Sequence, residues 1–211
     1  MSFSHETSAG IGETAPSSRT VPDFFGRLKG MLFAPRTEWR RVARESTTRW
    51  QLFYGYFLPL ATLTALLVPT RFSLFTHAPL AGVATLVAFT LAFQMLCVYV
   101  VSLIISGVAL YFRGVANPGQ SFKVAAYATT PLCLSSLSFP FPGVFVPLQL
   151  VAGLYHIFLM YLGVKELMKS PRDRALGYAT TVVLSSMILG IVYVQLSAAL
   201  GEALRLGHYT P

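Results

Sequence analysis

Residues 80–112, "LAGVATLVAFTLAFQMLCVYVVSLIISGVALYF", contain no charged residue and no proline. As a single helix this stretch would be about 50 Å long, whereas the hydrocarbon core of a bilayer is about 30 Å thick. No turn signal divides it into two shorter helices. We therefore interpret it as one membrane-spanning helix whose end extends into the interface, and this interpretation sets the fold class.

The composition of the whole chain agrees with a membrane environment. Of its 211 residues, 54% are hydrophobic and only 11% are charged, whereas soluble domains carry about 25% charged residues. The two cysteines, Cys97 and Cys133, lie in apolar runs. Two cysteines cannot form a disulfide framework, so they do not indicate whether the protein lies in an oxidising or a reducing compartment.

Three further stretches lack Lys, Arg, Asp and Glu, namely residues 50–70, 124–164 and 175–201. The sequence "FPFPG" at residues 139–143 divides the second of them and is typical of a tight turn. We therefore predict an all-α integral membrane protein with a five-helix transmembrane bundle. The third span is short, and tilt, local thinning or incomplete crossing would accommodate it. The predicted spans are residues 51–70, 80–112, 122–139, 143–165 and 176–200, within a membrane domain of residues 51–200 that precedes a C-terminal tail of residues 201–211.

The positive charges indicate how the spans are oriented. With a cytoplasmic N-terminus, nearly all Lys and Arg residues fall on the cytoplasmic side, and only Arg71 and Arg205 fall outside. The C-terminus is then expected outside. A chain with four or six spans would keep the asymmetry of its loops, so the count of five depends on turn signals. Membrane topology therefore explains the net charge of +8. Because this charge needs no nucleic-acid partner to explain it, we expect none.

The N-terminal part divides into a tail and a basic segment. Residues 1–22 are polar and lack the apolar core of a signal peptide, which predicts a disordered tail. Residues 23–50 place apolar side chains at helical spacing among basic ones, which predicts an amphipathic cytoplasmic segment. This segment either lies in the interface against anionic lipid or packs on the bundle as a cap. The basic residues expected to face lipid are Arg27, Lys29, Arg36, Arg40, Arg41 and Arg44.

Three stretches together resemble the Yip1 domain family of membrane proteins. They are "FFGRLKGMLFAPRTEWRRVARE" at residues 24–45, "FKVAAYATTP" at residues 122–131 and "AGLYHIFLMYLGVKELMKSPRDRALGYATTVVLSSMILGIV" at residues 152–192. The resemblance implies five helices and a cytoplasmic N-terminus. Eukaryotic members act in vesicle trafficking between endoplasmic reticulum and Golgi and associate with Rab GTPases, whereas prokaryotic members have no settled activity. The long acidic N-terminal extension of eukaryotic members is absent, which favours a prokaryotic inner membrane.

The same stretches supply the candidate site residues. His156 departs from the small residue that the family often has after "GLY", and it lies nine positions before Lys165. It would therefore lie about 13 Å deeper, near the bilayer centre, where we predict a neutral ring bonded to a neighbouring helix. Gly153 and Gly163 share its helix face and suit close packing. The site is either a packing site or a functional polar site, and its residues are Gly153, Tyr155, His156, Tyr127 and Pro131.

The sequence contains little that indicates catalysis. None of the spans contains Lys, Arg, Asp or Glu in its apolar stretch, and neither a zinc motif HExxH nor a serine motif GxSxG occurs. We expect no enzyme activity, no cofactor and no metal. A transporter or channel for small solutes or ions remains an alternative, because Pro131 and His156 fit a broken helix near the midplane. Charged residues that would mark an ion path are missing from the apolar stretches of the spans.

These observations favour a non-enzymatic, multi-pass protein of the inner (plasma) membrane. We expect it to act in membrane organisation or trafficking-like processes through association with lipid or protein. The expected partners are the bilayer with its anionic headgroups and either another membrane protein or a second copy of the chain.

Overall fold

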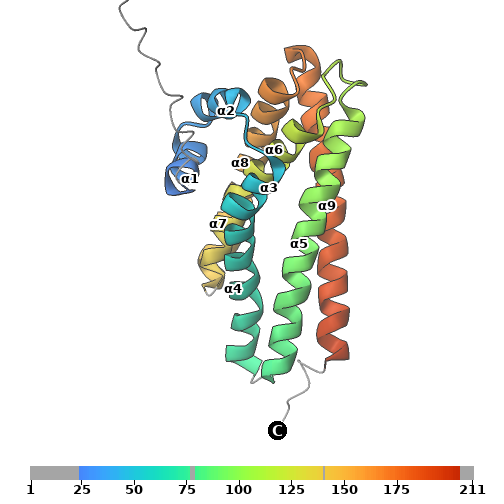
Figure 1. The fold of residues 1–211 in the computed structure, drawn as a ribbon. Helices are drawn as coiled ribbons and strands as arrows, with labels where there is room; N and C mark the ends of the chain where they lie inside the picture. The colour runs from blue at the N-terminus through green and yellow to red at the C-terminus, as the bar shows by residue number, and fades with distance from the viewer. Residues whose placement is uncertain (1–23, 77–78, 140, 205–211) are drawn as a thin grey trace, which may run out of the picture.

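The computed structural model describes residues 24–76, 79–139 and 141–204, so the predicted tail of residues 1–22 and Arg205 lie outside the described residues. Within these ranges every regular element is a helix, which confirms the predicted all-α class (Figure 1). The elements are α1 Phe24–Phe33, α2 Pro35–Arg44, α3 Arg49–Leu52, the π-helix η1 Phe53–Phe57, α4 Leu58–Thr76, α5 Leu80–Val108, α6 Pro118–Ala128, α7 Thr130–Ser135, the 3-10 helix η2 Ser136–Ser138, α8 Pro142–Leu167 and α9 Arg172–Ala203.

In the described part of the chain, 4 helices are long and apolar enough to cross a membrane. They are Arg49–Leu67, Leu80–Val108, Gly143–Leu167 and Arg172–Ala203. The predicted third span, residues 122–139, is not among them. It is divided among α6, α7 and η2, none of which is long enough to cross alone.

The division follows from the sequence "TTP" at residues 129–131. Pro131 has no N–H, so it cannot donate the helical hydrogen bond to the carbonyl of Tyr127. Thr130 Oγ1 donates to that carbonyl instead, at 2.7 Å. The Tyr56 hydroxyl lies 2.7 Å from Thr130 Oγ1 and donates to it, because the Thr130 proton is already used. Side chains thus satisfy the backbone where the helix is interrupted.

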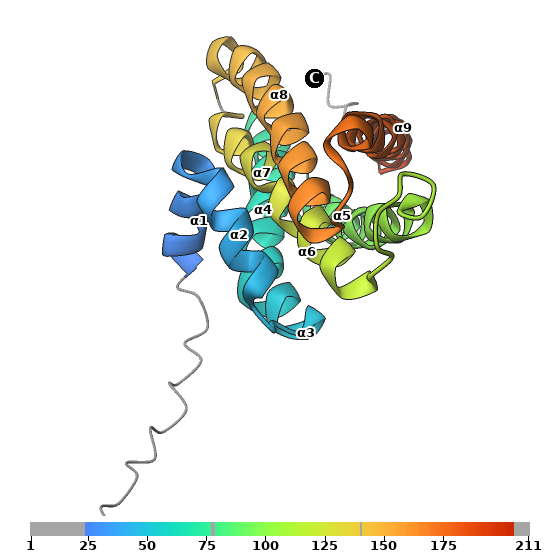
Figure 2. The same cartoon turned by 90° about the horizontal axis from the view of Figure 1, so that it is seen from above.

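The interrupted segment lies inside the bundle. The helix α6 packs against α5 and α8, and its residues 121–128 are all buried (Figure 2). The start of α8 lies closer to the end that carries α1 and α2 than the far ends of α4, α5 and α9 do (Figure 1). Irregular backbone at membrane depth is tolerated where protein surrounds it, and α6 meets that condition.

The helix α5 ends in a capped turn that carries a basic residue. The N–H of Arg113 donates to the carbonyl of Leu110 at 3.1 Å, and the N–H of Gly114 donates to that of Ala109 at 2.8 Å. Arg113 has a φ of 54°. This pair of bonds and the left-handed residue form a Schellman cap, so helical geometry continues to the predicted end near residue 112.

The buried core is concentrated at the end of the bundle where α1 and α2 pack. On α9, Tyr178 and Val182 are fully buried, whereas from Leu184 onward most side chains are exposed and apolar. On α5, Ile105 is fully buried, whereas Leu80 is 83% exposed. One end of the molecule is therefore a packed helical core. At the other end the long helices still touch, as where the rings of Phe89 and Tyr193 stack, but most of their apolar side chains are exposed.

Candidate functional site

The helices α1 and α2 form a hairpin that docks on the bundle. Ala34 joins them, and Pro35 occupies the first turn of α2, where its missing N–H leaves no hydrogen bond unmade. The Tyr155 hydroxyl, from α8, donates to the carbonyls of Met31 and Leu32 at 3.1 and 2.8 Å. These carbonyls belong to the last turn of α1 and have no partner within that helix. Tyr155 therefore caps α1 and fixes it to α8.

Trp39 is the apolar anchor of the hairpin. It is fully buried, and its ring meets that of Tyr127 edge-on at 6.1 Å between centroids. A Cβ added at Gly163 would lie 2.9 Å from Val124 Cγ1 and 3.0 Å from Trp39 Cη2, so the indole requires a glycine there. The predicted close packing is thus found at Gly163. The expectation for Gly153 is wrong, because a Cβ added there meets nothing within 4 Å.

Arg27 is the centre of a buried charge network. Its Nη1 lies 2.5 Å from Glu38 Oε1, and its Nη2 lies 2.6 Å from both carboxylate oxygens of Glu45. Its guanidinium carbon lies 5.5 Å from the centre of the Tyr127 ring, which is cation–π distance. Lys123 Nζ, from α6, donates to the carbonyl of Glu45 at 2.6 Å. The network joins the hairpin to α6, which is the innermost helix of the bundle.

The surroundings of Arg27 shift its pKa. Burial acts to lower the pKa of Arg27, but the hydrogen bond with Glu45 and the electrostatic interactions with Tyr127 and with the carboxylates of Glu45 and Glu38 outweigh it and raise that pKa. The Arg27 guanidinium therefore remains charged under all physiological conditions and needs its two carboxylates.

The burial of Arg27 corrects the predicted basic face. Arg27 is only 2% exposed and so cannot face lipid. The cause is the pair of acidic residues in this basic segment, because Glu38 and Glu45 bind its guanidinium. The remaining predicted basic residues are all exposed, and they are Lys29, Arg36, Arg40, Arg41 and Arg44.

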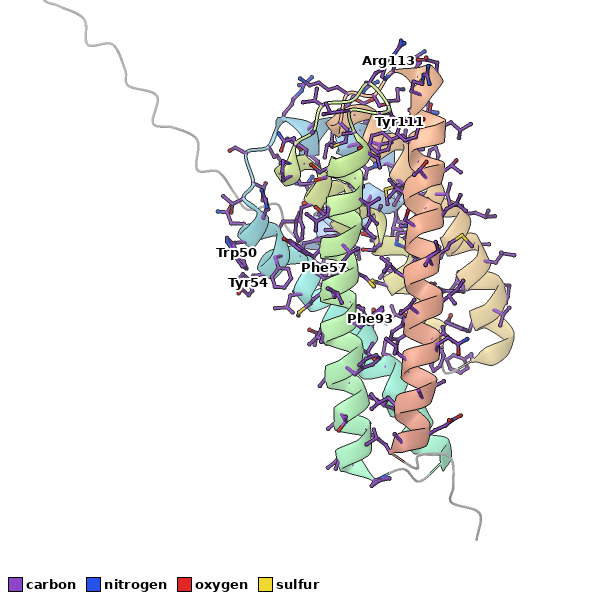
Figure 3. All side chains as sticks on the ribbon, turned by 90° about the vertical axis from the view of Figure 1, so that its right-hand side faces the viewer. Trp50, Tyr54, Phe57, Phe93, Tyr111 and Arg113 are labelled. Carbon is purple, nitrogen blue, oxygen red and sulfur yellow. The ribbon has the colours of Figure 1, made fainter. Side chains whose placement is uncertain are left out.

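Large aromatic side chains accompany these exposed cations. Phe25 is 72% exposed and Phe33 is 80% exposed on α1, while Trp50 and Tyr54 are 68% and 60% exposed at the start of the first long helix. Trp50 and Tyr54 stack with their ring centroids 6.0 Å apart, and both appear in Figure 3. We call the exposed set Phe25, Lys29, Phe33, Arg36, Arg40, Arg41, Arg44, Trp50 and Tyr54 the hairpin face.

His156 lies on a different side of α8 from its neighbour Tyr155. It is 7% exposed, and its Nδ1 donates to the carbonyl of Ala128 at 2.7 Å. Ala128 is the last residue of α6, just before the interruption at Pro131. The predicted hydrogen bond to a neighbouring helix is confirmed. His156, Thr130 and Tyr56 thus share one task, which is to satisfy polar groups where α6 meets α7.

The Yip1 domain model matches residues 29–194, from the middle of α1 to the second half of α9. The chain belongs to the Yip1 domain family. A comparison with curated proteins finds no match, and a comparison with solved structures finds none either. Membership identifies the chain as a Yip1-family membrane protein, in agreement with its membrane-capable helices.

In this Yip1 domain the predicted residues fall into two groups. His156 and Pro131 lie at the junction of α6, α7 and α8. The side chains of Tyr127 and Tyr155 turn toward the hairpin instead. Sequence reasoning missed the roles of Glu38, Glu45 and Lys123. One signal was present, because Glu38 and Glu45 lie seven positions apart and therefore on one side of a helix, in a segment otherwise rich in cations.

The Yip1 domain offers little that could hold a metal. In residues 24–76, 79–139 and 141–204 no group of three or more His, Cys, Asp or Glu side chains is placed to bind a metal ion. The buried polar groups at the α6–α7 junction are instead paired with one another. The arrangement is suited to holding helices in place and to presenting the hairpin face.

Proposed function

We propose that this Yip1-family protein is a non-enzymatic, multi-pass protein of the inner membrane that binds anionic lipid through the hairpin face and thereby contributes to membrane organisation. The observation that carries the proposal is the combination of exposed aromatic rings and exposed cations on a docked hairpin. Amphipathic surfaces of this composition lie in the headgroup region. Each Lys or Arg near an anionic leaflet contributes about 1 kcal/mol.

The proposed placement puts the hairpin end in the cytoplasm. About 20 residues of helix cross the hydrocarbon core, and on α5 this distance runs from Leu80 to Tyr99, which is 54% exposed. Trp50 and Tyr54 lie above Phe93 and below Tyr111 in Figure 3, so they suit the same interfacial level. In this placement α6, α7 and η2 together form one further pass, which lies against α8 and adds to the four long helices. The C-terminal end of α9 is then outside.

This placement revises the expected depth of His156. Its neighbour Tyr155 is bonded to the last carbonyls of α1, the helix that carries Phe25 and Phe33. His156 therefore lies level with the interfacial hairpin and not at the bilayer centre. The revised depth follows from the start of α8, which lies short of the far ends of the other long helices (Figure 1). A polar ring at this level has a smaller desolvation cost than one at the midplane.

The transport alternative has weaker support. An interrupted helix inside the bundle is a feature of transporters, and α6 and α7 provide one. The hydroxyls of Thr130 and Tyr56 and the ring of His156 are, however, engaged with each other or with nearby carbonyls. Binding of lipid by the hairpin face therefore remains the function that we propose.

Brominated lipids provide a test, because they quench tryptophan that they contact. The chain has 2 tryptophans, Trp39 in its buried socket and the exposed Trp50. In the full-length protein reconstituted into mixed vesicles, we expect brominated anionic lipid to quench Trp50 more strongly than brominated neutral lipid at the same mole fraction. Raising the salt concentration should reduce the difference, since screening weakens exposed charges.

Matched variants show whether the lipid preference depends on the cations of the hairpin face or on basic charge anywhere on the cytoplasmic end. The triple change Arg36→Gln, Arg40→Gln and Arg44→Gln should abolish the preference for anionic lipid. The control change Arg172→Gln and Arg174→Gln, at the start of α9, should leave it intact. Equal quenching by both lipids in the unmodified protein would contradict the proposed function.

A further inference from the structure

A second basic surface lies at the tip of the bundle, on two loops that touch. The loop after α5 and the loop after α8 are joined by two hydrogen bonds. The N–H of Val115 donates to the carbonyl of Met168 at 2.8 Å, and Ser170 Oγ donates to the carbonyl of Phe112 at 3.1 Å. We define the loop surface as the exposed tyrosine and basic residues of these loops and of the adjoining start of α9, namely Tyr111, Arg113, Lys169, Arg172 and Arg174.

Two of these cations occupy unfavourable backbone conformations. Arg113 has a φ of 54° and Lys169 has a φ of 53°, and in the described part of the chain they are the two non-glycine residues with positive φ. The left-handed conformation costs a side-chain-bearing residue about 1–2 kcal/mol, which is why glycine is usual just after a helix. A cation at a helix C-terminus recovers about 0.3–1 kcal/mol. The remaining strain indicates that the two charges serve a purpose beyond the caps themselves.

The loop surface lies beyond the reach of the protein's own bilayer. Arg113 follows Tyr99 by fourteen positions, so it lies about 21 Å farther along the helix axis. Figure 3 shows Tyr111 and Arg113 at the tip, well above Trp50 and Tyr54. The headgroup region occupies about 5–7 Å of this distance, which leaves about 15 Å, or nearly two screening lengths of about 8 Å at physiological salt, between these cations and the lipid headgroups.

We propose that the loop surface binds an acidic segment of a cytoplasmic partner protein. The proposal rests on the membrane placement given for the proposed function. Arginine and tyrosine are the residues that protein interfaces favour, and Tyr111 stands 82% exposed beside Arg113. Asp173, 3.7 Å from Arg174, makes the surface less suited to a continuous anionic plane such as a second bilayer. A short acidic segment can instead pair with Arg113, Lys169 and Arg172 and avoid Asp173.

The test uses the full-length protein in nanodiscs of anionic lipid and a fluorescent glutamate-rich peptide as the probe. The anionic lipid occupies the hairpin face, so the loop surface is the basic surface left free. We expect the double change Arg113→Gly and Lys169→Gly to weaken peptide binding about fivefold, as loss of two exposed charge pairs would. Because glycine relieves the strain, the unfolding midpoint should stay equal or rise, which separates lost binding from lost folding.

The matched control is the triple change Arg36→Gln, Arg40→Gln and Arg44→Gln on the hairpin face. Unchanged peptide binding in this variant supports both proposals. Weakened binding in both variants supports the loop surface but removes the proposed lipid contact of the hairpin. Unchanged binding in the glycine variant overturns the loop proposal. The same holds if that variant instead loses only the ability to tether a second anionic vesicle, because the partner would then be a bilayer.

Discussion

At the scale of single residues, Arg27 has the most unusual environment in the described structure. A buried arginine needs both its charge and its hydrogen-bond donors satisfied, and Glu38 and Glu45 supply most of this. Its Nε has no hydrogen-bond partner, so the network already leaves one donor unsatisfied. Removing the guanidinium would leave the buried Glu38 carboxylate without its cation, and Glu45 would keep only Arg41, at 3.5 Å.

We predict that Arg27→Met lowers the free energy of unfolding by about 3 kcal/mol, because it breaks a buried ion pair. Lys29→Met, two positions away on the exposed side, should change it by less than about 0.5 kcal/mol. The measurement is unfolding in detergent followed by tryptophan fluorescence, to which the buried Trp39 contributes. Equal midpoints for the two variants would mean that the network does not hold the hairpin.

The sequence could indicate that His156 bonds to a neighbouring helix, because a polar ring in an apolar helix needs a partner. It could not indicate that the partner is Ala128, since that requires knowing where α6 ends. It also could not separate Arg27 from the exposed cations of the same segment. Helical periodicity places residues on faces, but which face is buried depends on long-range contacts such as those with Tyr127 and Lys123.

At the scale of elements, α8 provides two glycines with opposite surroundings. Gly163 lies against Trp39 and Val124, whereas Gly153 has open space where a side chain would begin. The two positions test whether the hairpin docks as described, because the same substitution should have opposite effects on one helix.

We predict that Gly163→Ala destabilises the protein by about 1–3 kcal/mol, because its Cβ would overlap the indole and the valine. Gly153→Ala should be neutral or stabilising by up to about 1 kcal/mol, because alanine is the better helix former. The unfolding midpoint of each variant decides the matter. Destabilisation at residue 153 and tolerance at residue 163 would contradict the docking of Trp39.

The all-helical class could be predicted from the length and the apolar character of the charge-free stretches. The interruption of the third span could not be predicted with the same certainty, although its two causes are visible as Pro131 and the shortness of the segment. A proline can also kink a continuous membrane helix. The outcome here depends on Tyr56, Thr130 and His156, which come from three different elements and satisfy the freed backbone and its neighbours.

At the scale of the whole molecule, packing and charge are concentrated at the same end. The exposed apolar parts of α5, α8 and α9 extend from this end, and the hairpin covers its side (Figures 1 and 2). The molecule therefore combines a compact helical head with an apolar base, and the proposed membrane level passes between them.

We predict that cysteines placed on this framework report its orientation. In a background lacking Cys97 and Cys133, Glu202→Cys should react with an impermeant maleimide added to intact cells, and Phe141→Cys should react more slowly because α8 begins short of the far end (Figure 1). Ser46→Cys, next to the hairpin, should react only after the cells are opened. Reaction of Ser46→Cys in intact cells would reverse the proposed orientation.

The buried Lys123 has a consequence for biogenesis. A lysine near the start of a short segment disfavours the release of that segment from the translocon into lipid, and α6 with α7 is too short to compensate. The segment must therefore wait for α8, which surrounds it and supplies His156 to Ala128. Glu45, whose backbone carbonyl accepts a hydrogen bond from Lys123 Nζ, has by then already been synthesised. We therefore expect α6 and α7 to enter the membrane late, together with α8. The α1–α2 hairpin that binds them is synthesised before them.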